Sequence, residues 1–141
     1  MNQTHRLERQ AALRAHAATQ PGCTPYDNPR PVRVPNRFDG QTIQDCLEGL
    51  CKHIGTDRWP KAEAEDRLLI NERPARLDTR VKAGMIITYI VPQMVEPAIN
   101  PEITLVFEDE HLLVVNKPAP LPVHPCGRYN LNTLLQFFKT L

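Results

Sequence analysis

The chain has 141 residues, enough for one ordinary domain or for one small domain with flanking pieces. Its 17 basic and 16 acidic residues give a formal net charge of +1, so the total charge does not indicate a polyanionic partner. No run approaches the roughly 18 apolar residues of a membrane helix, and no apolar stretch near the start is typical of a secretion signal. We therefore expect a cytoplasmic protein without membrane contact.

Charge and proline are unevenly distributed along the chain. Up to Val95 there are 14 basic and 11 acidic residues, and from Glu96 onward 3 and 5, so a nucleic-acid contact is expected in the first two thirds. Many of the 14 prolines fall within residues 21–35 and 92–125. Such clusters are typical of linkers and domain joins.

The four cysteines, Cys23, Cys46, Cys51 and Cys126, show no C-x-x-C spacing. Because no secretion signal is present, a disulfide framework is not expected, and we predict reduced thiols. His124 and Cys126 lack two further ligands at suitable spacing, so no metal site is predicted.

Residues 1–20 are rich in alanine, leucine and arginine, which favour helix. The apolar face is thin, and Pro21-Gly22 ends the pattern, so we expect a frayed or disordered arm. An organelle transit peptide is the alternative, against which Glu8 counts.

Residues 21–37 are typical of an extended, proline-rich connector. Arg30, Arg33 and Arg37 alternate with proline and valine there. They either follow a phosphate backbone or belong to a solvated linker, and the linker is the interpretation we favour. Residues 1–37 are thus predicted to be a flexible arm and linker.

Residues 38–92 have globular patterning and begin with two helices. Apolar residues from Ile43 to Ile54 recur at three- and four-residue spacing, which predicts an amphipathic helix that Thr42 caps and Gly55 ends. A second short helix is predicted over residues 59–64, with Thr56 or Asp57 as its cap.

Strands and turns follow in the same segment. Residues 68–70 predict a strand, residues 71–74 a turn, and residues 75–79 a short return. After a turn at Gly84, residues 85–91 predict a longer strand.

The segments G-Q-T-I-Q-D-C-L, R-L-L-I-N-E-R-P-A-R and V-K-A-G-M-I-I-T-Y, in this order, resemble the small RNA-binding module of ribosomal protein S-four and many RNA-modifying enzymes. Two departures stand out: Glu72 occupies a position where the module commonly has glycine, and Met85 one where aspartate is usual. Glycine supplies a positive φ at low cost, so Glu72 predicts a different turn or strain.

The resemblance implies an RNA contact through basic side chains of this module. The candidates are Lys52, Arg58, Lys61, Arg67, Arg73, Arg76 and Arg80. Glu63, Glu65 and Asp66 dilute this patch, so we expect weak, salt-dependent binding. Trp59 either stacks on a base or belongs to the core, and the core is the more common place for the one tryptophan of a small domain.

Residues 93–102 are predicted to join this module to a second one. In residues 103–141, two apolar runs flank the acidic turn at residues 108–111, which predicts a β-hairpin. A stiff loop with four prolines follows, and then a helix from Leu134 that Asn132 or Thr133 caps. Because nothing in the sequence is left to cover the apolar face of this helix, we expect the face to be exposed and to invite self-association or pairing with another chain.

The run E-D-E-H-L-L-V-V-N-K-P, followed by L-P-V-H-P-C-G-R-Y and N-T-L-L, resembles the start of the catalytic domain of the RluA family of RNA pseudouridine synthases. Glu96-Pro97 matches an E-P that commonly precedes this domain. The resemblance implies an aspartate nucleophile, a uridine extruded from its stack, and neither metal nor organic cofactor. Lys117 and His124 match family positions and are candidates for support of the active site.

In that family the nucleophile lies in a later H-R-L-D-x-x-T-S-G-type segment, and these 141 residues contain no such segment. Asp109, the last aspartate, falls in a hairpin turn, and we assign no catalytic residue. We therefore expect an α+β chain: a helix-helix-strand RNA-binding module, followed by the first hairpin, proline loop and helix of an incomplete, mainly antiparallel pseudouridine synthase domain.

By family resemblance the function is conversion of uridine to pseudouridine in rRNA or tRNA, with this chain catalytically inactive and RNA-binding by itself. The alternatives are a free-standing, non-catalytic RNA-binding protein and a truncated, non-functional fragment.

Overall fold

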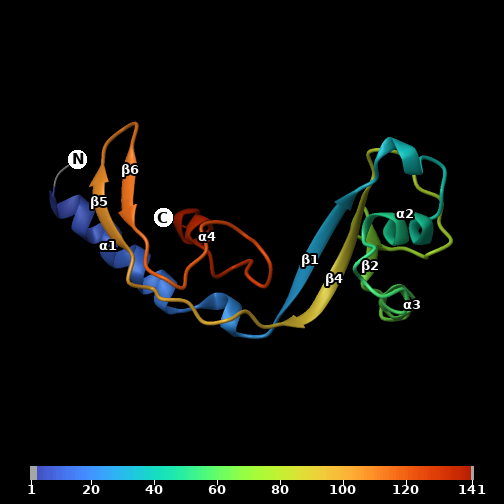
Figure 1. The fold of residues 1–141 in the computed structure, drawn as a ribbon, viewed down its shortest axis with the longest axis horizontal. Helices are drawn as coiled ribbons and strands as arrows, with labels where there is room; N and C mark the ends of the chain where they lie inside the picture. Colours follow the sequence, from blue (N-terminus) through green and yellow to red (C-terminus); the bar gives the residue numbers. More distant parts are fainter. Residues whose placement is uncertain (1–2, 141) are drawn as a thin grey trace. The chain divides into compact units, whose positions relative to one another are not determined.

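The computed structural model describes residues 3–140 and divides the chain into two compact units (Figure 1). The central unit is Asp27–Gln93, and the terminal unit combines Met1–Tyr26 with Met94–Leu141. The architecture is α+β with antiparallel strand pairing. These boundaries differ from the four segments expected from the sequence, because residues before position 27 and after position 93 pack together.

A four-stranded sheet organises the central unit, in the order β1-β4-β2-β3. The strands are β1 (Tyr26–Arg33), β2 (Leu68–Ile70), β3 (Arg73–Pro74) and β4 (Ile86–Met94). β2 is antiparallel to both neighbours, with Leu69 opposite Thr88 on β4 and opposite Pro74 on β3. Strands β2 and β4 thus lie where the sequence predicted strands. The expected return at residues 75–79 was wrong, because β3 lies within the expected turn at residues 71–74 and residues 75–79 form no strand.

Strand β1 lies within the segment that was expected to be a connector. It contains Pro29 and Pro31, which have no backbone N–H to donate. A strand with two prolines is tolerated only at an edge, and β1 is the outer strand, paired on one side with β4. The prediction of extended backbone was right, but the segment is part of the sheet.

Two helices pack with the sheet: α2 (Ile43–Leu50) and α3 (Arg58–Ala64), preceded by the 3₁₀ turn η2 (Asn36–Phe38). The capping box at α2 confirms the predicted cap: Thr42 Oγ1 accepts from Asp45 N–H at 3.1 Å, and Asp45 accepts from Thr42 N–H. α2 ends at Leu50, one turn earlier than predicted. The core of the unit is formed by Val34, Ile43, Cys46, Leu47, Trp59, Ala62, Leu68, Leu77, Val81, Ile87 and Tyr89.

The β2–β3 connection is a two-residue turn at Asn71 and Glu72, with φ of 50° and 64°. Two successive positive φ values are typical of a type I′ hairpin turn, which asparagine tolerates and glycine prefers at the second position. Glutamate at that position confirms the strain that the sequence predicted.

The terminal unit contains helix α1 (Gln3–Ala18), the 3₁₀ turn η1 (Pro21–Cys23), the hairpin of β5 (Thr104–Glu108) and β6 (Leu113–Asn116), and helix α4 (Leu134–Phe138). The hairpin is antiparallel, with an irregularity between Leu105 and Phe107. The core contains Leu13, Ala17, Ile99, Ile103, Leu105, Leu121, Leu134 and Phe137.

Residues 3–18 differ from the frayed arm that was expected. Leu13 and Ala17, four positions apart on α1, are fully buried against the hairpin and α4. Arg14 fixes the helix to the hairpin, donating to Ile103 O at 2.7 Å and Thr104 Oγ1 at 2.9 Å. The sequence predicted little burial because the apolar face of this helix is thin, and its packing depends on partners far away in the chain.

The C-terminal helix is covered within the chain, which corrects the expectation that its apolar face is exposed. Phe137 is fully buried, and its ring and the His16 ring form a T-shaped pair with centroids 5.5 Å apart. Helix α1 supplies the cover that the sequence did not reveal. Leu135 stays on the exposed side, and α4 ends at Phe138. The described helices include none with the length and apolar character required to cross a membrane.

Candidate functional site

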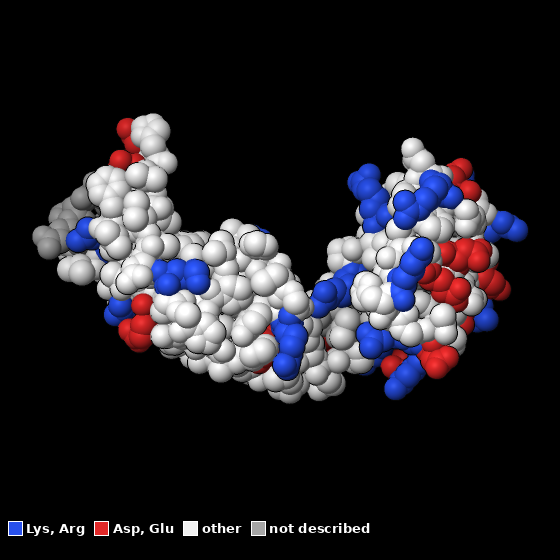
Figure 2. Space-filling model, viewed as in Figure 1, with Lys and Arg blue, Asp and Glu red and all other residues white. Residues whose placement is uncertain are grey.

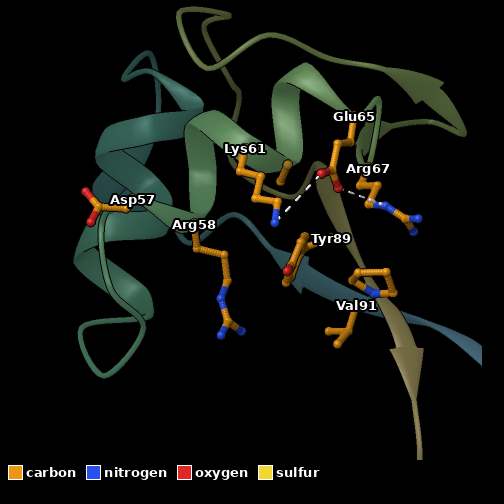
Figure 3. A pocket seen from close by; sticks show the side chains of 9 residues that line it. Asp57, Arg58, Lys61, Glu65, Arg67, Tyr89 and Val91 are labelled. Carbon is orange, nitrogen blue, oxygen red and sulfur yellow. Dashed lines mark ion pairs between the residues drawn. The ribbon is translucent and has the colours of Figure 1, made fainter.

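A pocket of about 460 Å³ opens in the central unit beside α3 and residues 89–92 of β4 (Figure 3). We call it the α3 pocket. Its charged lining consists of Arg58, Lys61 and Arg67 with Asp57 and Glu65, and its apolar lining of Ala62, Tyr89, Val91 and Pro92. Three of the seven predicted RNA-binding residues therefore meet at one place.

Helix geometry explains the convergence. Arg58, Lys61 and Glu65 are spaced by three and four positions from the first residue of α3 to its C-cap, so their side chains lie along one side of the helix. Arg67 enters from the segment between α3 and β2, and its carbonyl accepts from Ile90 N–H at 2.9 Å. This bond places Arg67 beside β4.

The ion pairs of the pocket converge on Glu65 and Arg67. One Glu65 oxygen lies 3.9 Å from Lys61 Nζ, and the other lies 3.3 Å from Arg67 Nε (Figure 3). Arg67 Nη1 also lies 3.1 Å from Asp27 Oδ2. The hydrogen bond from Gln93 N–H and then the Arg67 guanidinium hold the pKa of the exposed Asp27 carboxyl below its usual value.

Arg58 is the pocket cation that remains unengaged. Its side chain is exposed, and within residues 3–140 it makes neither a hydrogen bond nor an ion pair. In Figure 3 it extends on the side of Lys61 away from Glu65. The free guanidinium of Arg58 lies next to the ammonium of Lys61, whose ion pair with Glu65 is long. Two such cations are suited to binding an anionic ligand.

The other four candidates do not line this pocket. Arg76 lies between Glu63 and Asp78, at 3.9 and 3.8 Å, and Arg80 donates to the Gly40 carbonyl at 2.7 Å. Lys52 and Arg73 are exposed elsewhere on the unit. On the visible face of the central unit, basic and acidic side chains are interspersed, with no continuous basic stripe (Figure 2).

Trp59 lies in the core and is 1% exposed, and its ring forms a T-shaped pair with that of Tyr89, with centroids 5.4 Å apart. Trp59 therefore packs against Tyr89 from the core side and is not accessible for stacking on an RNA base. The sequence did not single out Tyr89, Val91 or Pro92, although alternate burial along β4 would have placed Tyr89 inward.

Lys117 and His124 belong to the terminal unit. Lys117 Nζ donates to the Leu121 carbonyl at 2.6 Å, which braces the proline loop. His124 is exposed. Asp109 Oδ1 accepts from His111 and Leu112 N–H at 2.8 and 2.7 Å, so this carboxylate is used by its own turn.

Glu96 is a buried carboxylate to which the sequence assigned no site role, although Glu96-Pro97 matched an E-P that commonly precedes the synthase domain. It is 3% exposed, and Oε1 accepts from Tyr26 Oη at 2.5 Å and Leu131 N–H at 2.7 Å. Oε2 accepts from Asn132 N–H at 2.8 Å. Burial alone would raise the pKa of Glu96, but hydrogen bonds from Leu131, Tyr26, Asn132 and Asn130 outweigh it and lower the pKa.

Gly22 and Asn132 complete this buried cluster. Gly22 N–H donates to Asn132 Oδ1 at 2.9 Å, and its carbonyl accepts from Glu96 N–H at 2.8 Å. A Cβ at Gly22 would lie 2.4 Å from Glu96 Cδ, so only glycine fits. Because the carboxylate is inaccessible and its acceptor sites are occupied, it holds the terminal unit together and is not available to a substrate.

Among residues 3–140, no group of three or more His, Cys, Asp and Glu side chains is arranged to hold a metal ion. No family model matches the chain. The curated proteins do include relatives. The chain is 37% identical over 70 residues to the mitochondrial tRNA pseudouridine(32) synthase of Saccharomyces cerevisiae, a match that covers 50% of this chain and 15% of the yeast protein.

Two further relatives carry similar names. RNA pseudouridine synthase 7 of Oryza sativa is 29% identical over 102 residues, 72% of this chain and 26% of the rice protein. The human pseudouridylate synthase RPUSD2 is 37% identical over 70 residues, 49% of this chain and 13% of that protein. The chain thus spans about an eighth to a quarter of the length of these relatives.

Proposed function

We propose that this chain, a relative of the RluA-like RNA pseudouridine synthases, takes part in the conversion of uridine to pseudouridine in RNA. We propose that it binds this RNA at the α3 pocket. The names of the relatives specify tRNA in one case and RNA in another, so RNA is the partner that we assign. The observation that carries the site is the meeting of Arg58, Lys61 and Arg67 beside an apolar wall. Cytoplasmic location, predicted from the sequence, stays part of the proposal.

Arg58 and Lys61 are the two residues proposed to contact phosphate. Both are exposed, Arg58 has no partner within residues 3–140, and Lys61 forms its ion pair with Glu65 at the long distance of 3.9 Å. Arg67 is engaged by two carboxylates and is proposed to shape the pocket. Phosphate contacts of this kind position an RNA without reading its sequence.

The two units correspond to two proposed modules. The order α2, α3, β2, turn, β4 in the central unit supports the proposal that this unit is the S-four-like RNA-binding module. The β5–β6 hairpin, the proline loop that Lys117 braces, and α4 are proposed to be the opening of the synthase domain, a mainly antiparallel domain in the family. No cofactor is assigned.

A non-catalytic RNA-binding protein is the second candidate. Asp109, the last aspartate of the 141 residues, is engaged by its own turn, and no H-R-L-D-type segment occurs in them. We therefore predict that the 141-residue chain does not release tritium from RNA labelled at uracil C5. Release at a rate that tracks the concentration of the purified chain would contradict this.

RNA binding is tested with fluorescence anisotropy of a labelled tRNA transcript at several salt concentrations. The double variant R58A/K61A is compared with K52A/R73A. This control also removes one lysine and one arginine, from exposed positions of the same unit outside the pocket. Loss of two phosphate contacts weakens binding about tenfold or more near 0.1 M salt and lowers the salt slope by roughly 1.4 to 1.8. Equal losses in the two double variants would contradict the pocket as the site.

A further inference from the structure

We infer that Glu65 is a built-in competitor for the phosphate in the α3 pocket, and that it keeps RNA affinity low. This inference rests on the proposed function, because it takes the ligand to be an RNA phosphate. It adds a regulatory role for a residue that the sequence marked only as diluting the basic patch. The evidence is the position of its carboxylate relative to Lys61 and Arg67.

Glu65 places its two oxygens where an anionic ligand would place its own. One oxygen is 3.9 Å from Lys61 Nζ and the other is 3.3 Å from Arg67 Nε. A carboxylate and a phosphate both present acceptor oxygens to the same donors. A phosphate that approaches Lys61 must therefore displace the Glu65 carboxylate or accept its repulsion (Figure 3).

The packing of the unit does not depend on this carboxylate. The Glu65 side chain is 43% exposed, and an exposed ion pair contributes little to stability. Arg67 keeps a second carboxylate, Asp27, at 3.1 Å. Removing the charge of Glu65 consequently frees Lys61 without leaving Arg67 unpaired.

The test compares E65Q with E48Q on the full chain. Glu48, on α2, accepts from Gln44 at 2.9 Å and lies outside the pocket lining, so E48Q makes the same change of net charge elsewhere in the unit. With the labelled tRNA transcript, E65Q is expected to bind about fivefold more tightly at 0.1 M salt, because the phosphate at Lys61 no longer has to displace the Glu65 carboxylate or accept its repulsion. E48Q is expected to match the wild type.

A second variant ties the tighter binding to Lys61. In a K61A background, the effect of E65Q is expected to shrink, because the cation that Glu65 engages is gone. A thermal melt monitored by Trp59 fluorescence checks that each variant is folded. If E65Q does not fold, E65A with the same K61A comparison takes its place.

The outcomes separate the two claims. If R58A/K61A weakens binding while E65Q behaves as E48Q does, the site stands and the competition is overturned. If the wild type, E65Q and E48Q all fail to bind RNA at low salt, the proposed function fails and the inference with it. Tighter binding by E65Q that persists undiminished in K61A also overturns competition at Lys61.

Discussion

Glu96 Oε2 accepts a hydrogen bond from the backbone N–H of Asn132 at 2.8 Å, 36 positions along the chain. The Asn132 side chain in turn accepts from Gly22 N–H at 2.9 Å. One buried cluster thus connects three segments that are far apart in sequence: the turn η1 at Gly22, the segment of residues 93–102 at Glu96, and the residues just before α4 at Asn132. The stability of the terminal unit should therefore depend on each member of this cluster.

Replacing Glu96 by glutamine is expected to destabilise the terminal unit by about 1–3 kcal/mol, because an amide NH₂ would face a backbone N–H that needs an acceptor. Urea unfolding followed by far-UV circular dichroism measures the change. Trp59, the one tryptophan, lies in the core of the central unit, so its fluorescence serves as an internal control. E102Q is the matched variant, since Glu102 is 66% exposed in its ion pair with Arg14; equal losses in both variants would contradict a special role for Glu96.

The lowered pKa of Glu96 predicts acid sensitivity. Its pKa in the folded chain lies below the 4.5 of an unperturbed glutamate, so the unfolded chain binds more protons between the two values. The stabilisation is therefore present above about pH 4.5 and is lost as the pH falls through the folded pKa. The free energy of unfolding of the wild type should fall below pH 4.5 more steeply than that of E96Q; parallel pH profiles would refute this.

Gly22→Ala is expected to destabilise the terminal unit by about 1–3 kcal/mol, the usual cost of an overpacked core site. The added Cβ would lie 2.4 Å from Glu96 Cδ, and a shift of this carboxylate would disrupt its hydrogen bonds from Tyr26, Leu131 and Asn132. Gly55→Ala is the control, because no atom lies within 4 Å of its added Cβ and its φ is not positive. Amide hydrogen exchange at Asn132 and Leu134 reports the local opening, and unchanged exchange in Gly22→Ala would sink the prediction.

Glu72→Gly is expected to stabilise the central unit by about 0.5–1 kcal/mol, since Glu72 has a φ of 64° that glycine adopts at lower cost. Trp59 fluorescence during urea unfolding is the measurement. Glu72→Ala removes the same charge and keeps the strain, so it should give no such increase in stability. If the alanine and glycine variants are equally stabilised, charge and not backbone conformation is the cause.

Local patterns in the sequence predicted much of the central unit. Thr42 with Asp45 marks the start of α2, and the run at residues 68–70 marks β2, because each depends on neighbours a few positions away. Thr133 likewise caps α4 as predicted. Strand β1 was missed because Pro29 and Pro31 are typical of linkers and become compatible with a strand only at an edge.

Long-range packing explains the remaining differences. The burial of Leu13 depends on residues about 90 to 120 positions away, so helical periodicity alone did not reveal it. At the α3 pocket, the spacing of Arg58 and Lys61 on a predicted helix indicated a shared side. The approach of Arg67, Glu65 and Tyr89 depends on how the segment after α3 meets β4, and no local pattern encodes it.

The shared core of Leu13 and Phe137 also determines the order of events at the ribosome. The central unit has every residue it needs once position 93 has emerged, and compact units fold as they are synthesised. Helix α1 is synthesised before the hairpin and α4, and Leu13 and Ala17 can be buried only after those elements have emerged. A segment that is synthesised before the central unit is therefore expected to join a core only after that unit has folded.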